Sequence, residues 1–394
     1  MVRSICPPLD DVRRIVVLRP GAVGDFVFAL PALHALKQTY PEAELVLVGK
    51  AWHRMFLQGR PGPVDRVVEI PPVPGVGTSP AVVDVAAAGA TPGMAPVAEA
   101  GAEAEAEAEA EAAAEAAAEA VERFIDEMRA ERFDLALQMF GGGRYSNPFL
   151  LRFGARLTVG ACTPGVHLLD RWIEFREPSQ RRLALLEIAG LAGADVRLPP
   201  ATQAELALTE ADRDEAASVV PVMPDQRLVV LQPGSTDPRR RWPARSFAAL
   251  GDRLAQDGAC VAINGSPDET ALVHEVAAGM RAPAIVLAGR LGLGGLCGLL
   301  ERTALLVSND TGPLHLGLAL GVPSVGIFWL TNLIEGMPLR PSSLHAALSV
   351  RTRCPVCDQD NLHRRCPHDV SFVADVSIDE VETLARAACD RRSP

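Results

Sequence analysis

The chain has 394 residues, more than one ordinary hydrophobic core accommodates, and this length predicts two domains. Hydrophobic residues make up 48% of it and aromatic residues 5%, a composition typical of globular α/β proteins. The formal net charge of −11 argues against a nucleic-acid partner. Much of that charge is local, because residues 99–120 hold eight Glu and neither Lys nor Arg.

The chain shows no targeting or membrane-spanning pattern. Residues 1–14 lack the apolar segment of a signal peptide. The longest apolar run, residues 314–330, is interrupted by His315, several Gly and Pro323, and predicts a buried helix and strand rather than a membrane span. Eight scattered cysteines do not resemble a secreted disulfide framework. We therefore expect a cytoplasmic protein.

Short apolar strands alternate with helical patterns in the N-terminal part. Residues 14–19 are a β-branched run that ends at Pro-Gly, and residues 26–38 follow with helical spacing. Further strands are expected at 45–49 and 67–70. This alternation predicts a parallel sheet covered by helices, in a Rossmann-like domain that spans residues 1–200.

Residues 73–120 interrupt the alternation. Their first part is rich in Pro, Gly and Ala, and their second part is a low-complexity run of Ala and Glu. We expect an inserted surface segment whose acidic part is a solvated helix that continues into residues 121–132. The α/β pattern then resumes with a strand at 134–139 and a glycine turn at 141–143.

A second α/β unit follows a predicted linker at residues 201–226. This unit is expected over residues 227–345 as a second Rossmann-like domain, and residues 346–394 as a cysteine-containing tail with a closing amphipathic helix at 377–388. In folds of this kind such a helix commonly packs back on the first domain. The strands of the second unit are expected at 228–232, 260–264, 284–288, 305–310 and 324–329. Ligands of such sheets bind at the carboxyl ends of the strands.

The first predicted strand leads into a loop with Gly21, Gly24 and Asp25. Glycines allow a ligand to approach the backbone, and the helix that follows presents N–H groups to an anion. Asp25 could take a proton from an acceptor hydroxyl, or it could simply be a first-turn Asp favoured by the helix dipole. The dinucleotide-binding fingerprint is incomplete, which disfavours a dehydrogenase.

The first strand of the second unit leads into Gly234, Ser235 and Thr236, followed by three consecutive Arg at 239–241 and by Trp242. Guanidinium groups bind phosphate oxygens through paired hydrogen bonds, so this loop predicts a diphosphate site that uses Arg240 and Arg241. Alternatively, one of the Arg pairs with a carboxylate and Trp242 belongs to the core.

The strand at 305–310 leads into Asp310, Thr311 and Gly312, with His315 one turn further along. Thr311 suits the N-cap of the next helix, whose first N–H groups would bind phosphate without a metal. His315 could add a donor or could be a structural residue. Glu269 follows another predicted strand and could accept from ribose hydroxyls, or it could be a solvated first-turn Glu.

Together, these motifs resemble glycosyltransferase family 9, the lipopolysaccharide heptosyltransferase family, which has the GT-B fold of two Rossmann-like domains that face a central cleft. The resemblance covers most of the chain apart from the insert. The matching pieces occur in the order of the family: Gly-x-x-Gly-Asp at 21–25, Pro-Gly at 233–234, Arg-Trp-Pro at 241–243, and Asn-Asp-Thr-Gly-Pro-Leu-His at 309–315, with the weaker Gly-Ser-Pro-Asp-Glu at 265–269. The chain has Arg240 where many members have Lys.

The resemblance implies an inverting transferase that needs no cofactor and moves heptose from ADP-heptose to a lipopolysaccharide-type or related bacterial surface glycan. It implies that Asp25 is the base, that residues 310–315 hold the donor diphosphate and that Glu269 lies near the ribose. The first domain would bind the glycan or glycolipid acceptor, with possible peripheral contact at the inner membrane. Two rival readings are the same fold with another nucleotide sugar and a non-catalytic nucleotide-binding domain pair.

Two further groups of residues are candidates for binding. Arg144 and Arg152 in the first domain are candidates for an anionic acceptor, although surface Arg is often only solvated. Three Cys and one His in the tail could form a structural zinc site. The spacing lacks the second pair of a standard zinc ribbon, so we expect no metal, and these four residues remain the alternative: Cys354, Cys357, Cys366 and His368.

Overall fold

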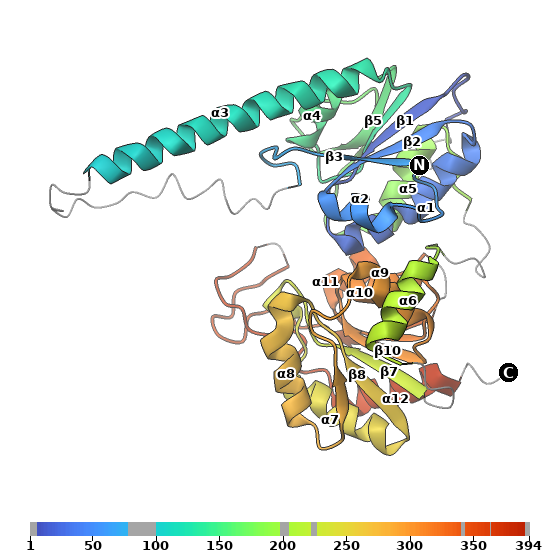
Figure 1. Cartoon of the computed structure of the whole chain (residues 1–394), viewed down its shortest axis with the longest axis vertical. Helices are drawn as coiled ribbons and strands as arrows, with labels where there is room; N and C mark the ends of the chain where they lie inside the picture. The colour runs from blue at the N-terminus through green and yellow to red at the C-terminus, as the bar shows by residue number, and fades with distance from the viewer. Residues whose placement is uncertain are drawn as a thin grey trace.

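The computed structural model describes residues 6–77, 100–197, 205–221, 227–339, 343–362 and 364–390. They form two α/β domains, each built on a six-stranded parallel sheet (Figure 1). This confirms the predicted fold class. Within the described ranges, no helix is long and apolar enough to cross a membrane.

The sheet of the first domain has the strand order β3-β2-β1-β4-β5-β6. Its central strand β1 is fully buried from its second residue onward, because helices cover both faces of a parallel sheet. The strands are β1 (Arg14–Leu18), β2 (Glu44–Gly49), β3 (Arg66–Glu69), β4 (Leu135–Gln138), β5 (Leu157–Cys162) and β6 (Arg171–Glu174). The helices are α1 (Val23–Thr39), α2 (Ala51–Leu57), α3 (Ala100–Ala130), α4 (Ser146–Leu151) and α5 (Arg181–Leu191).

The sheet of the second domain has the order β12-β11-β10-β7-β8-β9, which repeats the connectivity of the first sheet. Its strands are β7 (Arg227–Gln232), β8 (Ala259–Ile263), β9 (Ala284–Val286), β10 (Leu305–Asn309), β11 (Ser324–Trp329) and β12 (Leu344–Ser349). Its helices are α6 (Glu210–Val219), α7 (Ala244–Gln256), α8 (Thr270–Gly279), α9 (Leu293–Glu301), α10 (Gly312–Ala319), α11 (Leu330–Gly336) and α12 (Ile378–Asp390). Two 3₁₀ turns, η3 (Pro238–Arg240) and η4 (Pro267–Glu269), lie in its loops.

The predicted insert and linker are described only in part. Residues 78–99 of the insert lie outside the described residues, as do residues 201–204 and 222–226 of the linker. Within the linker, α6 is a helix that packs against α9 of the second domain. The acidic part of the insert is α3, which continues into residues 121–130 as predicted.

Helix α3 is attached to the first domain by its C-terminal third. Phe124, Ile125 and Met128 are buried there. The Phe124 ring packs on those of Phe149 and Phe153, with centroid distances of 6.0 and 6.1 Å. The preceding part extends away from the domain (Figure 1). Residues 112–116 of this part are exposed, as expected for an Ala/Glu sequence that offers no apolar face to the domain.

The closing helix α12 does not pack on the first domain, and that expectation was wrong. It packs on β12, β11 and α7 of the second domain, with Val381, Ala385 and Ala388 buried. The tail reaches this place along the loop that follows β7, where the Trp242 indole N–H donates to the carbonyl of Val376 at 2.9 Å. These contacts join the cysteine-containing tail to the second core.

Candidate functional site

In each sheet the strand order reverses beside the first strand, between β1 and β4 and between β7 and β10. Helices that follow such neighbouring strands leave on opposite faces, which opens a crevice at the carboxyl ends of the strands. The loops with Asp25 and Asp310 both leave strands at these two points. The site predicted from the sequence therefore lies where this topology places ligands.

A cavity of about 770 Å³ opens at the carboxyl ends of the first sheet. This volume suits a ligand of a few sugar rings. Its wall combines the ends of β4 and β6 with α5 as far as Ile188, and one residue comes from α11 of the second domain. The lining residues include Arg19, Asp25, Trp172, Arg181 and Glu335.

Asp25 lies in the first turn of α1 and lines this cavity. Its Oδ2 accepts from the amide of Ala22 at 3.1 Å, and its Oδ1 lies 3.2 Å from an Nη atom of Arg19. Burial raises the pKa of the Asp25 carboxyl, but Arg19, the Ala22 amide and Arg181 together outweigh burial, so that the pKa lies below the ordinary 3.8. The first-turn interpretation is confirmed, and the same carboxylate is ionised and faces a cavity.

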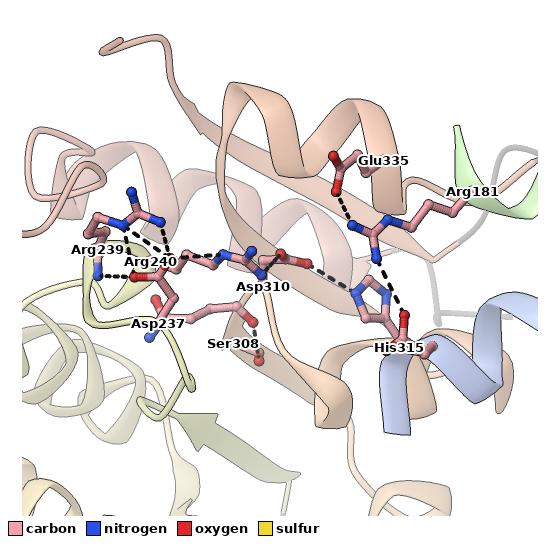
Figure 2. Close-up of polar contacts among 10 residues, drawn as sticks. Arg181, Asp237, Arg239, Arg240, Ser308, Asp310, His315 and Glu335 are labelled. Carbon is pink, nitrogen blue, oxygen red and sulfur yellow. Dashed lines mark hydrogen bonds and ion pairs between the residues drawn. The ribbon is translucent and has the colours of Figure 1, made fainter. Parts of the chain in front are cut away.

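Arg181 connects the two domains beside Asp25. One Nη atom lies 3.4 Å from Asp25 Oδ1, and the other lies 2.8 Å from Oε2 of Glu335 on α11 (Figure 2). Burial raises the pKa of Glu335, and Arg181 opposes this shift. A single guanidinium thus holds one carboxylate from each domain at the cavity.

The N-termini of α1 and α10 meet across the two domains. A Cβ added to Gly24 would lie 3.2 Å from Cδ2 of His315, and one added to Gly312 would lie 3.0 Å from Cβ of Val23. Glycine at both positions therefore allows the two helix starts to approach closely. Because the first N–H groups of a helix have no partner within the helix, this junction gathers positive partial charge from both domains.

A chain of polar contacts runs through the loop after β10. His315 Nε2 lies 3.0 Å from one oxygen of Asp310, and Arg240 Nη1 lies 3.3 Å from the other (Figure 2). The His315 ring also packs on Phe28 of α1 at 4.6 Å between centroids. Thr311 occupies the N-cap of α10, as predicted. These contacts agree with a structural histidine and bring Arg240 to the start of α10.

The three consecutive Arg have different surroundings. Arg239 is buried and pairs with Asp237 at 2.6 Å, so the carboxylate alternative holds for this residue. Arg241 donates through Nε to the carbonyl of Ser235 at 2.8 Å, while the Arg240 side chain is 35% exposed beside Asp310. Of the three, Arg240 is therefore placed best to meet a ligand. Trp242 is 1% exposed and belongs to the second core.

Gly234 and Glu269 lie against each other at the carboxyl ends of β7 and β8. A Cβ added to Gly234 would lie 1.9 Å from Oε1 of Glu269, so a larger residue would displace this carboxylate from its place. Glu269 Oε2 accepts from the Ser266 amide at 2.9 Å. Glu269 thus caps η4 and faces the loop after β7. In the first domain, Gly21 likewise leaves room for a carboxylate residue, because a Cβ added to it would lie 2.6 Å from Cβ of Asp25.

Ser235 is buried within the loop after β7, whereas Thr236 is exposed. Arg144 and Arg152 are not among the residues that line the cavity. Arg144 lies over the ring of Tyr145, with 5.8 Å to the ring centroid. Arg152 pairs with Glu122 of α3.

Sequence reasoning missed several residues of the site. Arg19, the last residue of its predicted strand, could have been identified from the sequence. A cation at the carboxyl end of a buried strand needs a partner, and this requirement points to a polar site. Asn309 was part of the 309–315 motif, but its role was not predicted: its Oδ1 accepts from the Trp242 amide at 3.0 Å and its Nδ2 donates to the Pro233 carbonyl at 2.7 Å, which joins the loops after β7 and β10. Arg181 and Glu335 lie in no motif.

The structure also brings together the four candidate zinc ligands of the tail. Their ligand atoms all lie within 4.8 Å of one another. These residues are Cys354, Cys357, Cys366 and His368.

Comparisons with known proteins place the chain in a family. Residues 121–359, more than half of the chain, match the family model described as glycosyltransferase family 9 (heptosyltransferase). Lipopolysaccharide heptosyltransferase 3 of Escherichia coli is 30% identical over 116 residues, which are 29% of this chain and 34% of that protein. Lipopolysaccharide heptosyltransferase 1 of Pseudomonas aeruginosa is 32% identical over 122 residues, which are 31% of this chain and 33% of that protein. The chain thus spans about a third of the length of the curated relatives it matches.

Solved structures match over nearly the full length. The glycosyl transferase family 9 protein of Veillonella parvula has a TM-score of 0.68 at 17% identity, with 98% of this chain and 100% of that chain covered. ADP-heptose lps heptosyltransferase II of E. coli has a TM-score of 0.67 at 16% identity, with 97% and 100% covered. At these identities the likeness concerns the fold, which is GT-B. From the family match and this shared fold, the chain belongs to glycosyltransferase family 9, the heptosyltransferase family.

Proposed function

We propose that the chain is an inverting glycosyltransferase that moves heptose from ADP-heptose to a lipopolysaccharide-type or related bacterial surface glycan. Family membership supports the reaction class, and the names of the curated relatives support heptose and lipopolysaccharide. The observation that carries the proposal is an ionised carboxylate, Asp25, in a cavity beside the junction of two helix N-termini.

In this proposal Asp25 acts as the general base. An acceptor hydroxyl in the cavity loses its proton to the carboxylate while its oxygen bonds to the anomeric carbon of the donor. The bond between that carbon and the diphosphate oxygen breaks, and ADP leaves with the electron pair. Attack opposite the leaving group inverts the anomeric centre, so one suitably placed carboxylate suffices.

The donor diphosphate would lie at the N-terminus of α10, where Thr311 and Gly312 present their amides. Arg240 contacts Asp310 just before this helix start, and it would exchange this contact for one with phosphate. Glu269 would accept from the ribose. Positive charge from an Arg and two helix N-termini can meet the charge of the leaving diphosphate, so the proposal requires no metal at this site.

The acceptor would enter the cavity on the first domain. Trp172 offers an apolar ring to a sugar face, and Arg181 offers a cation to an anionic group once it leaves Glu335. Arg144 and Arg152 lie outside this cavity and stay candidates for more distant parts of a long acceptor. For a glycolipid acceptor, the site of action would be the cytoplasmic face of the inner membrane, with peripheral contact.

The nucleotide is tested by the melting temperature with ADP, UDP, GDP or ADP-heptose at saturating concentration. A ligand at a hundred times its dissociation constant adds about 2.7 kcal/mol of stability, which raises the melting temperature by a few degrees. Selective stabilisation by ADP and ADP-heptose is expected. Selective stabilisation by UDP or GDP would reject the donor, and no shift with any of them would favour a non-catalytic role.

The base is tested by Asp25→Asn, which keeps the size of the side chain and removes its charge. Transfer should fall by about 10²–10⁴-fold, the usual contribution of a general base, while the ADP-induced shift in melting temperature persists. Asp126→Asn on the exposed surface of α3 is the control and should leave transfer unchanged. Full turnover in Asp25→Asn would remove the assignment.

A further inference from the structure

Three cysteines and one histidine from two separate turns of the tail converge on one point. Their ligand atoms all lie within 4.8 Å of one another, and Cys354 Sγ lies 3.7 Å from Nδ1 of His368. Around a tetrahedral zinc ion, bond lengths near 2.3 Å to sulfur and 2.0 Å to nitrogen place these two atoms about 3.5 Å apart. The Cys354–His368 pair is therefore close to the spacing that the ion requires, and the other ligand atoms lie near enough to join the same ion.

The first turn has a backbone conformation that presents two thiols to one side. The Cys354 amide donates to the carbonyl of Gln359 at 2.9 Å, and the Asp358 amide donates to the carbonyl of Cys354 at 2.9 Å. Asp358 has φ of 56°, the left-handed conformation that closes this turn. The Val356 amide points at Cys354 Sγ, 3.4 Å away. An N–H directed at sulfur stabilises the thiolate, which is the metal-binding form.

The second turn is tied to the first through the side chain of Asn361. Asn361 Oδ1 accepts from the Cys366 amide at 3.0 Å, and Asn361 Nδ2 donates to the carbonyl of Gln359 at 2.8 Å. Cys366 is 5% exposed, and His368 follows it after a single Pro. The asparagine thus holds the Cys366 turn against the Cys354 turn, and both bring their ligands to the same point.

We propose that Cys354, Cys357, Cys366 and His368 bind one structural Zn²⁺. Three thiolates and an imidazole are a borderline-soft set that suits Zn²⁺ in a closed tetrahedral site, and they do not suit the oxygen-seeking Mg²⁺ or Ca²⁺. A disulfide within three thiols leaves one thiol unpaired and gives the histidine no role. Apolar packing does not explain the group either, because Cys357 is exposed and His368 is half-buried.

The site would hold the loop that carries Arg240. Asn361, between the two ligand turns, accepts from Arg239 Nη1 at 3.4 Å, and the Phe372 amide donates to the Arg239 carbonyl at 2.7 Å. Ser371 Oγ donates to the carbonyl of Arg241 at 2.6 Å. The tail is therefore hydrogen-bonded to the residues on both sides of Arg240. The effect of these hydrogen bonds on donor binding rests on the proposed function, whereas the zinc site itself does not.

The experiment is elemental analysis of the full-length protein, purified without chelators from zinc-supplemented medium. About one zinc per chain is expected, and less than a tenth of that in Cys366→Ser and His368→Ala. Cys6→Ser, far along the chain in the first domain, is the matched control and should keep its zinc. His368→Cys should also keep zinc, because a fourth thiolate replaces the imidazole; a histidine that only packs would not predict this rescue.

Cobalt gives a second readout that needs neither activity nor variants. Co²⁺ in the site should show thiolate-to-metal charge-transfer absorption and the intense visible bands of a tetrahedral complex, and Zn²⁺ should displace it. Folded metal-free protein with three reactive tail thiols would overturn the proposal, as would a disulfide among them or stoichiometric iron instead of zinc. ADP affinity that stays unchanged on zinc loss would overturn the link to Arg240, whereas failure of the proposed function would leave the zinc measurement intact.

Discussion

Burial raises the pKa of Asp25 and the neighbouring cations lower it, and the net effect is a pKa below the ordinary value. Arg19 is a permanent part of this balance, because it is buried and also holds the carbonyl of Asp25 through two donors at 3.0 and 2.9 Å. Arg181 belongs to it only while it stays between Asp25 and Glu335. The basicity of Asp25 therefore depends on whether an acceptor draws Arg181 away.

This dependence gives a prediction for Arg181→Gln. With the wild type, kcat/KM should show no acid limb above about pH 5, because the pKa of Asp25 lies below its ordinary value. Loss of the Arg181 cation should raise that pKa and move the limb to higher pH. The measurement is the pH profile of transfer, with the exposed Arg197→Gln as a control that keeps the wild-type profile. An unshifted limb in Arg181→Gln would contradict the coupling.

His53 gives a second prediction, for stability. Burial and the Arg19 charge lower the pKa of its imidazole to about 3. The unfolded chain binds the proton from about pH 6.5 downward while the folded chain does not, so folded stability falls as the pH falls below about 6.5. The contribution of this group at pH 5.5 is a loss of about 1.4 kcal/mol relative to pH 7.5.

Urea unfolding at these two pH values checks it. His53→Asn should unfold more easily at both, since the ring stacks on Trp52 at 3.6 Å, but should lose this part of the pH dependence. His274→Asn, at an exposed position of α8, should behave like the wild type. An equal pH dependence in His53→Asn and the wild type would show that another group titrates.

Between elements, the packing of α6 on α9 depends on small residues. A Cβ added to Gly298 would lie 2.1 Å from the carbonyl oxygen of Asp212, which is a backbone atom that cannot rotate away. Gly295 lies against the side chain of Glu215, whose Cδ would be 2.4 Å from an added Cβ. The two helices therefore approach at backbone distance, and this contact fixes α6 to the second domain.

Gly298→Ala should consequently force the helices apart and cost about 1–3 kcal/mol, the usual penalty of overpacking. Gly62→Ala is the control, because no atom lies within 4 Å of its added Cβ. Equilibrium unfolding in urea measures both free energies. A Gly298→Ala protein as stable as Gly62→Ala would mean that α6 and α9 are less closely packed than described.

The sequence allowed the elements with strong patterns to be predicted and hid those whose identity depends on packing. β1, β7 and β10 are continuous apolar runs before glycine or Asp-Thr-Gly loops, so their carboxyl ends were expected to carry the site. β6 was missed because it is a half-buried edge strand of four residues without such a run. The placement of α12 was predicted wrongly, because its apolar face shows that it packs but not on which sheet.

The same distinction holds for the site. Asp25 and Asp310 each follow a strand, so local pattern and sheet topology together were enough to place them at carboxyl ends. The contact of Arg181 with Glu335 joins residues 154 positions apart, and only the arrangement of two whole domains creates it. The spacing of the tail cysteines raised the zinc site as an alternative, but their convergence depends on the fold of both turns.

At the scale of the molecule, a buried ion pair joins the domains. Arg60, which follows α2, bonds Asp212 of α6 through two contacts of 2.6 and 2.9 Å, with side chains only 3% and 6% exposed. Asp212 also caps α6 by accepting from the Thr209 amide at 2.9 Å. Removal of either partner leaves a charge in a dry interface, which is far more costly than loss of a surface pair.

Arg60→Ala should therefore lower the free energy of unfolding by about 3–5 kcal/mol and separate the unfolding of the two domains into two steps. Arg213→Ala removes the neighbouring pair with Glu301, whose side chains are 48% and 39% exposed, and should cost at most about 1 kcal/mol. Calorimetry distinguishes these outcomes. One cooperative transition with a small loss in Arg60→Ala would mean that other contacts hold the domains together.

Helix α3 makes the charge distribution of the molecule asymmetric. Its 31 residues span about 46 Å, and its free part lies in the stretch that holds the eight Glu. Charges screen one another over about 8 Å in physiological salt, so this arm carries negative potential far beyond the reach of the body's own charges. Any surface of the same charge would repel this arm more strongly than it repels the body, so α3 would point away from an anionic surface that the molecule approaches.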